Sequence, residues 1–102
     1  MAPILSQHLG GIQALCRKYA VQLLEAFGSV TRQDFDPTHS DVDLLVLFQK
    51  SSAMGKADLF LGLLGELERL FGKKVDLVDI RAARNPYFIA EALRSRVRLY
   101  AT

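Results

Sequence analysis

The most constraining feature of this chain is a pair of acids, Asp41 and Asp43, followed directly by the apolar run 44–48. Such a run is typical of a strand buried on both faces of a sheet, so we predict a central strand over 41–48 with the acids at its N-terminal end. Side chains two apart on a strand point to the same face, so the two carboxylates should converge. Like charges held that close favour a bound cation, although the same spacing also occurs in solvated turns.

Composition fits one globular domain spanning residues 1–102, with 50% hydrophobic and 24% charged residues. A net charge of +2 permits an anionic substrate without demanding nucleic acid, and we expect no direct nucleic-acid binding. The lone Cys16 cannot form an internal disulfide, which suits a reducing compartment. Neither a signal peptide nor a membrane-length apolar run is present, so we expect a soluble cytoplasmic protein.

Hydrophobic periodicity predicts three helices. The first ends near Lys18, and its apolar face comprises Leu9, Ile12, Leu15, Cys16 and Tyr19. The second spans 59–71 and ends at Gly72 as a C-cap. The third begins at Asn85 and Pro86, and its apolar face comprises Ile89, Ala92, Leu93 and Val97.

Two further short apolar segments, 21–27 and 75–80, are predicted to be strands. Gly28 and Ser29 end the first, in which Glu25 is the one residue that fits poorly. Because Gly allows backbone amides to approach a phosphate and Ser adds a hydroxyl donor, this turn suits a bound nucleotide, at the start of a short helix. A polar loop over 31–40 then leads to the acids.

A third carboxylate could come from the last predicted strand, which contains Asp76 and Asp79. Residues three apart on a strand face opposite sides, so only one of them can join Asp41 and Asp43. We choose Asp76. The basic segment that includes Arg96 and Arg98 is read as a solvated surface, with contact to a partner or RNA left open.

Together these motifs resemble the minimal nucleotidyltransferase family of the polymerase-β-like superfamily. The resemblance rests on segments 27–29, 40–46, 74–78, 85–87 and 98–100 and on Arg32, while Gln33 stands where the family often has Gly. It implies an α/β (α+β) fold, a small mixed sheet flanked by helices.

The resemblance also implies a site. Asp41 and Asp43 would bind Mg²⁺ with ATP as the nucleotide, and Asp76 would be a ligand to a second metal or the base that takes the acceptor proton. The nucleotide-binding residues would be Gly28, Ser29, Arg32 and Ser40.

The acceptor follows from size and resemblance. A chain of 102 residues has little material beyond its catalytic core for an acceptor pocket, so another protein should present the acceptor. In the family resembled, the partner is commonly a HEPN-domain toxin, and the enzyme acts as its antitoxin by transferring AMP to a tyrosine. Two alternatives stay open: a non-catalytic antitoxin that acts by binding, and transfer to a small molecule such as an antibiotic. The oligomeric state, homodimer or hetero-oligomer, is also open.

Overall fold

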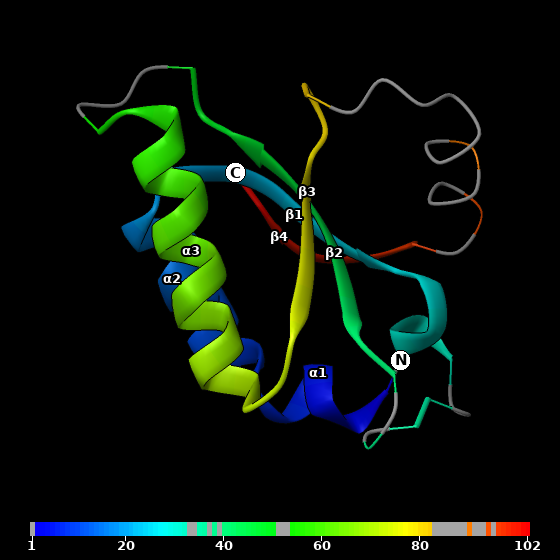
Figure 1. The fold of residues 1–102 in the computed structure, drawn as a ribbon. Helices are drawn as coiled ribbons and strands as arrows, with labels where there is room; N and C mark the ends of the chain where they lie inside the picture. Colours follow the sequence, from blue (N-terminus) through cyan, green and yellow to red (C-terminus); the bar gives the residue numbers. More distant parts are fainter. Residues whose placement is uncertain are drawn as a thin grey trace.

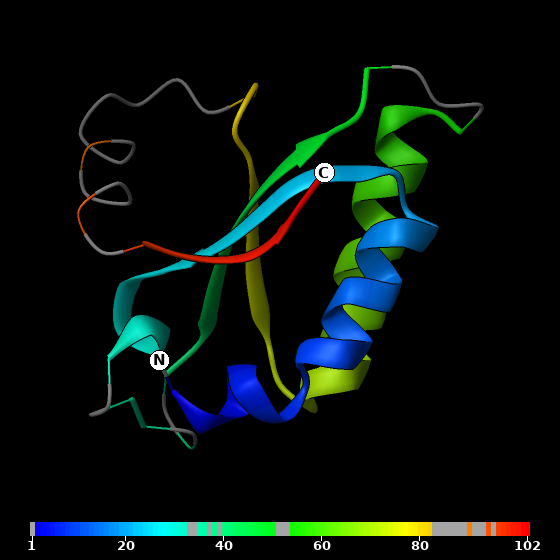
Figure 2. The ribbon, with the colours of Figure 1, turned by 180° about the vertical axis from the view of Figure 1, so that it is seen from behind.

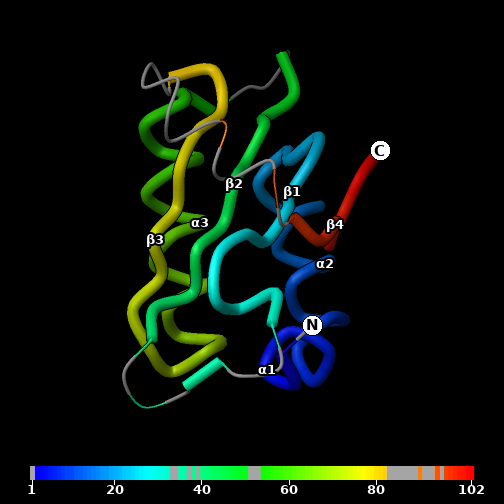
Figure 3. Tube along the Cα trace, turned by 90° about the vertical axis from the view of Figure 1, so that its right-hand side faces the viewer, coloured from blue at the N-terminus to red at the C-terminus, as the bar shows by residue number. Residues whose placement is uncertain are grey.

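The computed structural model describes residues 2–32, 35–36, 38, 40–50, 54–82, 90, 94 and 96–102. These form α1 (Pro3–Gln7), α2 (Leu9–Lys18), β1 (Val21–Phe27), the 3-10 helix η1 (Gly28–Thr31), β2 (Val42–Phe48), α3 (Lys56–Phe71), β3 (Val75–Asp79) and β4 (Arg96–Ala101). The strands lie in the order β3-β2-β1-β4, as Figure 3 shows from left to right. Strand β1 is antiparallel to β2 and β4, and β2 is parallel to β3. The predicted α/β fold with a mixed sheet is therefore confirmed.

Helices α2 and α3 lie together against one face of this sheet (Figures 1 and 2), which we call the helix face. Helix α3 buries Leu59, Leu63, Leu67 and Phe71, which recur every fourth residue. It ends at Gly72, which has a φ of 68° and whose backbone N–H donates to the carbonyl of Glu68. No helix among the described residues has the length and apolar character needed to cross a bilayer.

Strand β2 divides its side chains between the two faces of the sheet. Its alternate residues, Val42, Leu44, Val46 and Phe48, belong to the main core with the helices. Leu45 instead packs with Phe27, and Val78 and Ile80 lie against that pair. These residues mark the second face of the sheet, to which Asp43 must also point because it alternates with the core residues.

Several predicted elements are confirmed. Helix α2 ends at Lys18, β1 spans Val21–Phe27, and a short helix begins at Gly28. Strand β2 begins at Val42, one residue later than predicted, so Asp41 precedes the strand. Helix α1, which begins at Pro3, was not predicted.

The prediction for the C-terminal segment is wrong at Val97. This residue lies in β4 and pairs with Ala26 of β1, whereas the sequence analysis placed it on a helix. Val97 and Leu99 face the main core while Arg96 and Arg98 alternate with them, which is the two-residue period of a strand. The rest of the predicted helix, Asn85, Pro86, Ile89, Ala92 and Leu93, lies outside the described residues.

Candidate active site

Two of the three predicted acids are neighbours in the sheet. Asp43 on β2 is the register partner of Asp76 on β3, so the two residues are directly opposite each other on parallel strands. Both side chains point to the second face, since the residues beside them, such as Leu44 and Leu77, belong to the main core. Asp43 is half-buried, whereas Asp76 and Asp41 are exposed.

Gly28 brings the end of β1 against the carboxylate of Asp43. The preceding residue, Phe27, pairs with Asp43 across the two strands, and Gly28 then turns with a φ of 72°. A Cβ placed on Gly28 would lie 2.7 Å from Oδ2 of Asp43, closer than a Cβ approaches a non-bonded atom. The positive φ favours glycine here, and any larger residue would have to displace the carboxylate of Asp43.

Hydrogen bonds hold the short helix that follows. The hydroxyl of Thr31 donates to the carbonyl of Gly28 at 2.7 Å, and the backbone N–H of Arg32 donates to the carbonyl of Ser29 at 3.0 Å. Ser29 is half-buried and Arg32 is exposed. The turn is thus fixed at both ends of η1, with Arg32 as its C-cap.

The fourth predicted nucleotide-binding residue, Ser40, lies on the other side of the acids. It is half-buried and directly precedes Asp41, and its backbone N–H donates to the carbonyl of Asp36 at 2.9 Å. Of these four residues, Gly28 is therefore the one for which the structure gives a close approach to an acid.

Electrostatics single out Asp43. Burial, followed by the negative charges of Asp76 and then Asp41, raises the pKa of the Asp43 carboxyl from its ordinary 3.8 to about 6. Each of these causes disfavours the ionised form. A carboxylate whose ionised form is disfavoured by burial and by neighbouring negative charges is suited to binding a cation, because the positive charge offsets that repulsion.

The three carboxylates do not form a preassembled metal centre. Across the described residues, no three His, Cys, Asp or Glu side chains are gathered so that they could hold a metal ion. Asp41 and Asp76 nevertheless both act on the charge of Asp43, so the acids share one electrostatic environment. Their oxygen donors are those that Mg²⁺ prefers, and one or two carboxylates with phosphate oxygens and water usually suffice for this ion.

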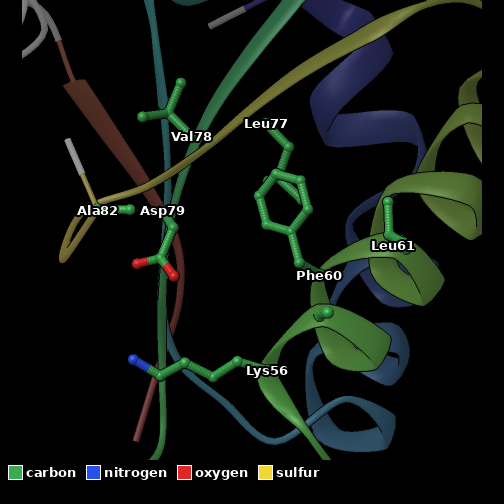
Figure 4. Close-up of a pocket in the computed structure, with 8 residues that line it drawn as sticks. Lys56, Phe60, Leu61, Leu77, Val78, Asp79 and Ala82 are labelled. Atoms are coloured by element: carbon green, nitrogen blue, oxygen red, sulfur yellow. The ribbon is translucent and has the colours of Figure 1, made fainter.

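Asp79 lies apart from this group. It lines a cavity of about 580 Å³ between α3 and β3, together with Phe60 and Lys56 (Figure 4). Its Oδ1 accepts a hydrogen bond of 2.9 Å from the backbone N–H of Arg81. Asp76 and Asp79 thus point to opposite faces, as predicted.

Sequence reasoning did not assign a role to Glu25. Its side chain is buried on β1, where Arg96 and Arg98 of β4 form ion pairs with it. The available signal was a lone carboxylate within an otherwise apolar strand. Its partners are far away in the sequence, so only the pairing of β1 with β4 reveals them.

A mixed sheet that sets paired aspartates beside a Gly-Ser turn defines a class of protein that handles phosphate esters with the help of a cation. The sequence itself gives the family. Residues 11–102 match the family described as "Polymerase beta, Nucleotidyltransferase", and the chain belongs to it. It is a nucleotidyltransferase.

Individual relatives agree with this assignment. The chain is 34% identical over 70 residues to a candidate protein adenylyltransferase of Methanocaldococcus jannaschii, a match that covers 69% of this chain and 68% of that protein. A solved structure of a candidate minimal nucleotidyltransferase is 29% identical, with a TM-score of 0.75 over 91% of this chain and 90% of that one.

A third likeness shows the fold alone. It is to a complex of the tri-AMPylated HEPN toxin of Shewanella oneidensis with its MNT antitoxin. The identity is 23% and the TM-score 0.67, over 95% of this chain and 72% of that one.

Proposed function

We propose that this nucleotidyltransferase transfers AMP from ATP to a tyrosine hydroxyl of a partner HEPN toxin and thereby acts as its antitoxin. The observation that carries the catalytic part is the pairing of Asp43 with Asp76 beside Gly28. The similarity to a candidate adenylyltransferase supports AMP as the transferred group. The fold shared with an antitoxin bound to an AMPylated HEPN toxin supports the partner.

Asp41 and Asp43 would hold Mg²⁺, and Asp76 would join them either as a ligand to a second ion or as the base. Bound Mg²⁺ supplies positive charge that neutralises the triphosphate and orients its α-phosphate. The raised pKa of Asp43 fits this assignment, since a nearby cation favours the ionised carboxylate that repulsion disfavours.

The chain's own residues then position the substrates. Gly28 and Ser29 would bind the phosphates. Arg32 and Ser40, near the two ends of the loop that joins η1 to β2, would also contact the nucleotide. The acceptor oxygen forms a bond to the α-phosphorus, the bond from that phosphorus to the β-phosphate oxygen breaks, and pyrophosphate leaves with the electron pair. In both roles of Asp76, the acceptor hydroxyl would lie next to this side chain; as the base, Asp76 takes the hydroxyl proton, and as a ligand to a second ion it leaves the proton to pass to solvent water.

Intact mass spectrometry of the partner tests the proposal. The protein encoded next to this chain is incubated with it, Mg²⁺ and ATP, and its mass should rise by whole AMP units. Asp76→Asn should abolish the increase, while Asp79→Asn, in the same strand but on the helix face, should preserve it. A stable complex without any mass increase would favour inhibition by binding alone, and AMP found on a small molecule would favour the alternative of transfer to such a molecule.

A further inference from the structure

A buried carboxylate lies on the same face of the sheet as the acids, two strands away from Asp76. Glu25 of β1 is 3% exposed and is the buried charged residue of the described chain. Its Oε1 lies 3.5 Å from Nη1 of Arg96, and its Oε2 lies 3.4 Å from Nε of Arg98. The two arginine side chains remain 47% and 62% exposed, so the cluster carries a net charge of +1 and presents it to solvent.

The strand register places Arg96 in one row with the acids. Phe27 of β1 pairs with Arg96 on β4 and with Asp43 on β2, and Asp43 pairs with Asp76 on β3. Residues that are directly opposite across strands point to the same face. The row across the second face is therefore Asp76, Asp43, Phe27 and Arg96. Since strands are spaced by about 4.8 Å, the backbone of Arg96 lies about 10 Å from that of Asp43.

Arg96 keeps hydrogen-bonding capacity for a ligand. A guanidinium has N–H donors in a planar fork that matches carboxylates and phosphates. Within the described residues, the side chain of Arg96 forms an ion pair with Glu25. At 3.5 Å this pair is longer than a good hydrogen bond. Glu25 therefore positions a guanidinium whose side chain is 47% exposed and can donate to an anion from solution.

Reaction geometry identifies the anion. In nucleotidyl transfer the acceptor and the leaving pyrophosphate lie on opposite sides of the α-phosphorus. In the proposed function the acceptor lies next to Asp76 on β3, so the pyrophosphate would extend in the other direction, toward Gly28 at the end of β1. Helix η1, which begins at Gly28, packs against β4, the strand that carries Arg96.

We propose that Arg96, positioned by Glu25, binds the terminal phosphates of the triphosphate and holds the pyrophosphate as it leaves. The inference rests on the proposed function and names a further residue of the same site. When the bond between the α-phosphorus and the β-phosphate oxygen breaks, that oxygen takes the electron pair, and the N–H groups of Arg96 donate to the departing anion. No proton moves in this step.

Binding of inorganic pyrophosphate and of AMP, each with Mg²⁺ and measured by isothermal titration calorimetry, tests the role of Arg96. Arg96→Gln should weaken pyrophosphate binding about tenfold or more, whereas Arg96→Lys, which keeps the charge but loses the planar fork, should recover only part of this loss and stay about threefold or more weaker than wild type. AMP lacks the terminal phosphates, so its affinity should stay within about twofold in every variant. Thermal unfolding of each variant verifies that it is folded.

Arg98→Gln is the matched control. Arg98 pairs with the same Glu25 but is two residues farther along β4, about 7 Å beyond the row of acids. It should change pyrophosphate affinity less than about twofold. Equal losses for the two glutamine variants would show a general charge effect and overturn the proposal.

The outcomes also separate this inference from the proposed function. If the wild-type protein modifies its partner but wild type and Arg96→Gln bind pyrophosphate equally, the role of Arg96 is overturned and the proposed function stands. Wild-type protein that binds neither pyrophosphate nor ATP overturns both. Should Arg96→Gln fail to fold, Arg96→Lys and Arg98→Gln still decide, because equal loss in both would contradict the proposal.

Discussion

Replacing Asp43 with asparagine should stabilise the metal-free protein while abolishing nucleotidyl transfer. The pKa of Asp43 is raised to about 6 by burial and by the charges of Asp76 and Asp41. Ionisation of Asp43 therefore destabilises the folded state. In the unfolded chain the carboxyl is solvated and farther from other charges, so its ionisation carries no such penalty. Asparagine keeps the shape of the side chain and removes the charge.

The magnitude follows from linkage. A pKa raised from 3.8 to about 6 corresponds to at most about 3 kcal/mol, since one pKa unit is equivalent to about 1.4 kcal/mol. Solvent screening at a half-buried group lowers this to about 1–2 kcal/mol. The folded state binds the proton more tightly, so stability falls as pH rises from 3.8 through about 6. The gain in unfolding free energy from Asp43→Asn is therefore largest above about pH 7 and falls to a small fraction of that value by about pH 4.

Thermal unfolding without divalent cations is the assay. At pH 8 the melting temperature of Asp43→Asn should exceed that of wild type by about 4–12 °C, with little difference at pH 4. Added Mg²⁺ should stabilise the wild type and narrow the gap. Asp79→Asn, on the other face of the sheet, should melt within about 3 °C of wild type. A lower melting temperature for Asp43→Asn at pH 8, or an equal gain at both pH values, would refute the electrostatic reasoning.

Three further predictions concern single side chains. Gly28→Ala should lower transfer activity at least about tenfold. Alanine at a φ of 72° costs about 1 kcal/mol, and its Cβ would displace the carboxylate of Asp43. The transfer rate and the affinity for Mg²⁺–ATP measure the effect. Asp76→Asn should abolish transfer without unfolding the protein, whereas Asp79→Asn should retain it within about threefold, as radiolabelled AMP incorporation would report. Cys16 should resist thiol reagents at pH 8 in the folded protein, because burial raises its pKa to about 12, and should react at once in denaturant.

Each of these three has an outcome that contradicts it. Normal transfer by Gly28→Ala would mean that the turn does not contact the working site. Equal loss from Asp76→Asn and Asp79→Asn would contradict the strand register. Rapid labelling of native Cys16 would show that α2 opens readily from the core.

Local patterns in the sequence were enough for the elements whose periodicity is strong. The fourfold spacing of Leu59, Leu63 and Leu67 defines one face of α3, and the apolar run after Asp43 defines β2. Such patterns indicate which residues are buried. An element buried on one face has periodic apolar residues, whereas a strand buried on both faces has a continuous apolar run. Strand β4 was missed because a short alternation at Arg96–Ala101 competes with helical spacing carried over from the residues before it.

The sequence by itself placed Asp41 and Asp43 at the start of a central strand that follows a Gly-Ser turn, with both side chains toward one face, because backbone geometry alone sets which side chains share a face. Only the tertiary structure decided that Asp43 is paired with Asp76, lies against Gly28 and has a raised pKa. Only the pairing of β4 with β1 brought Arg96 to Glu25. Strand order and register join residues that are distant in the sequence, and they are settled by how the whole core packs, which no local pattern encodes.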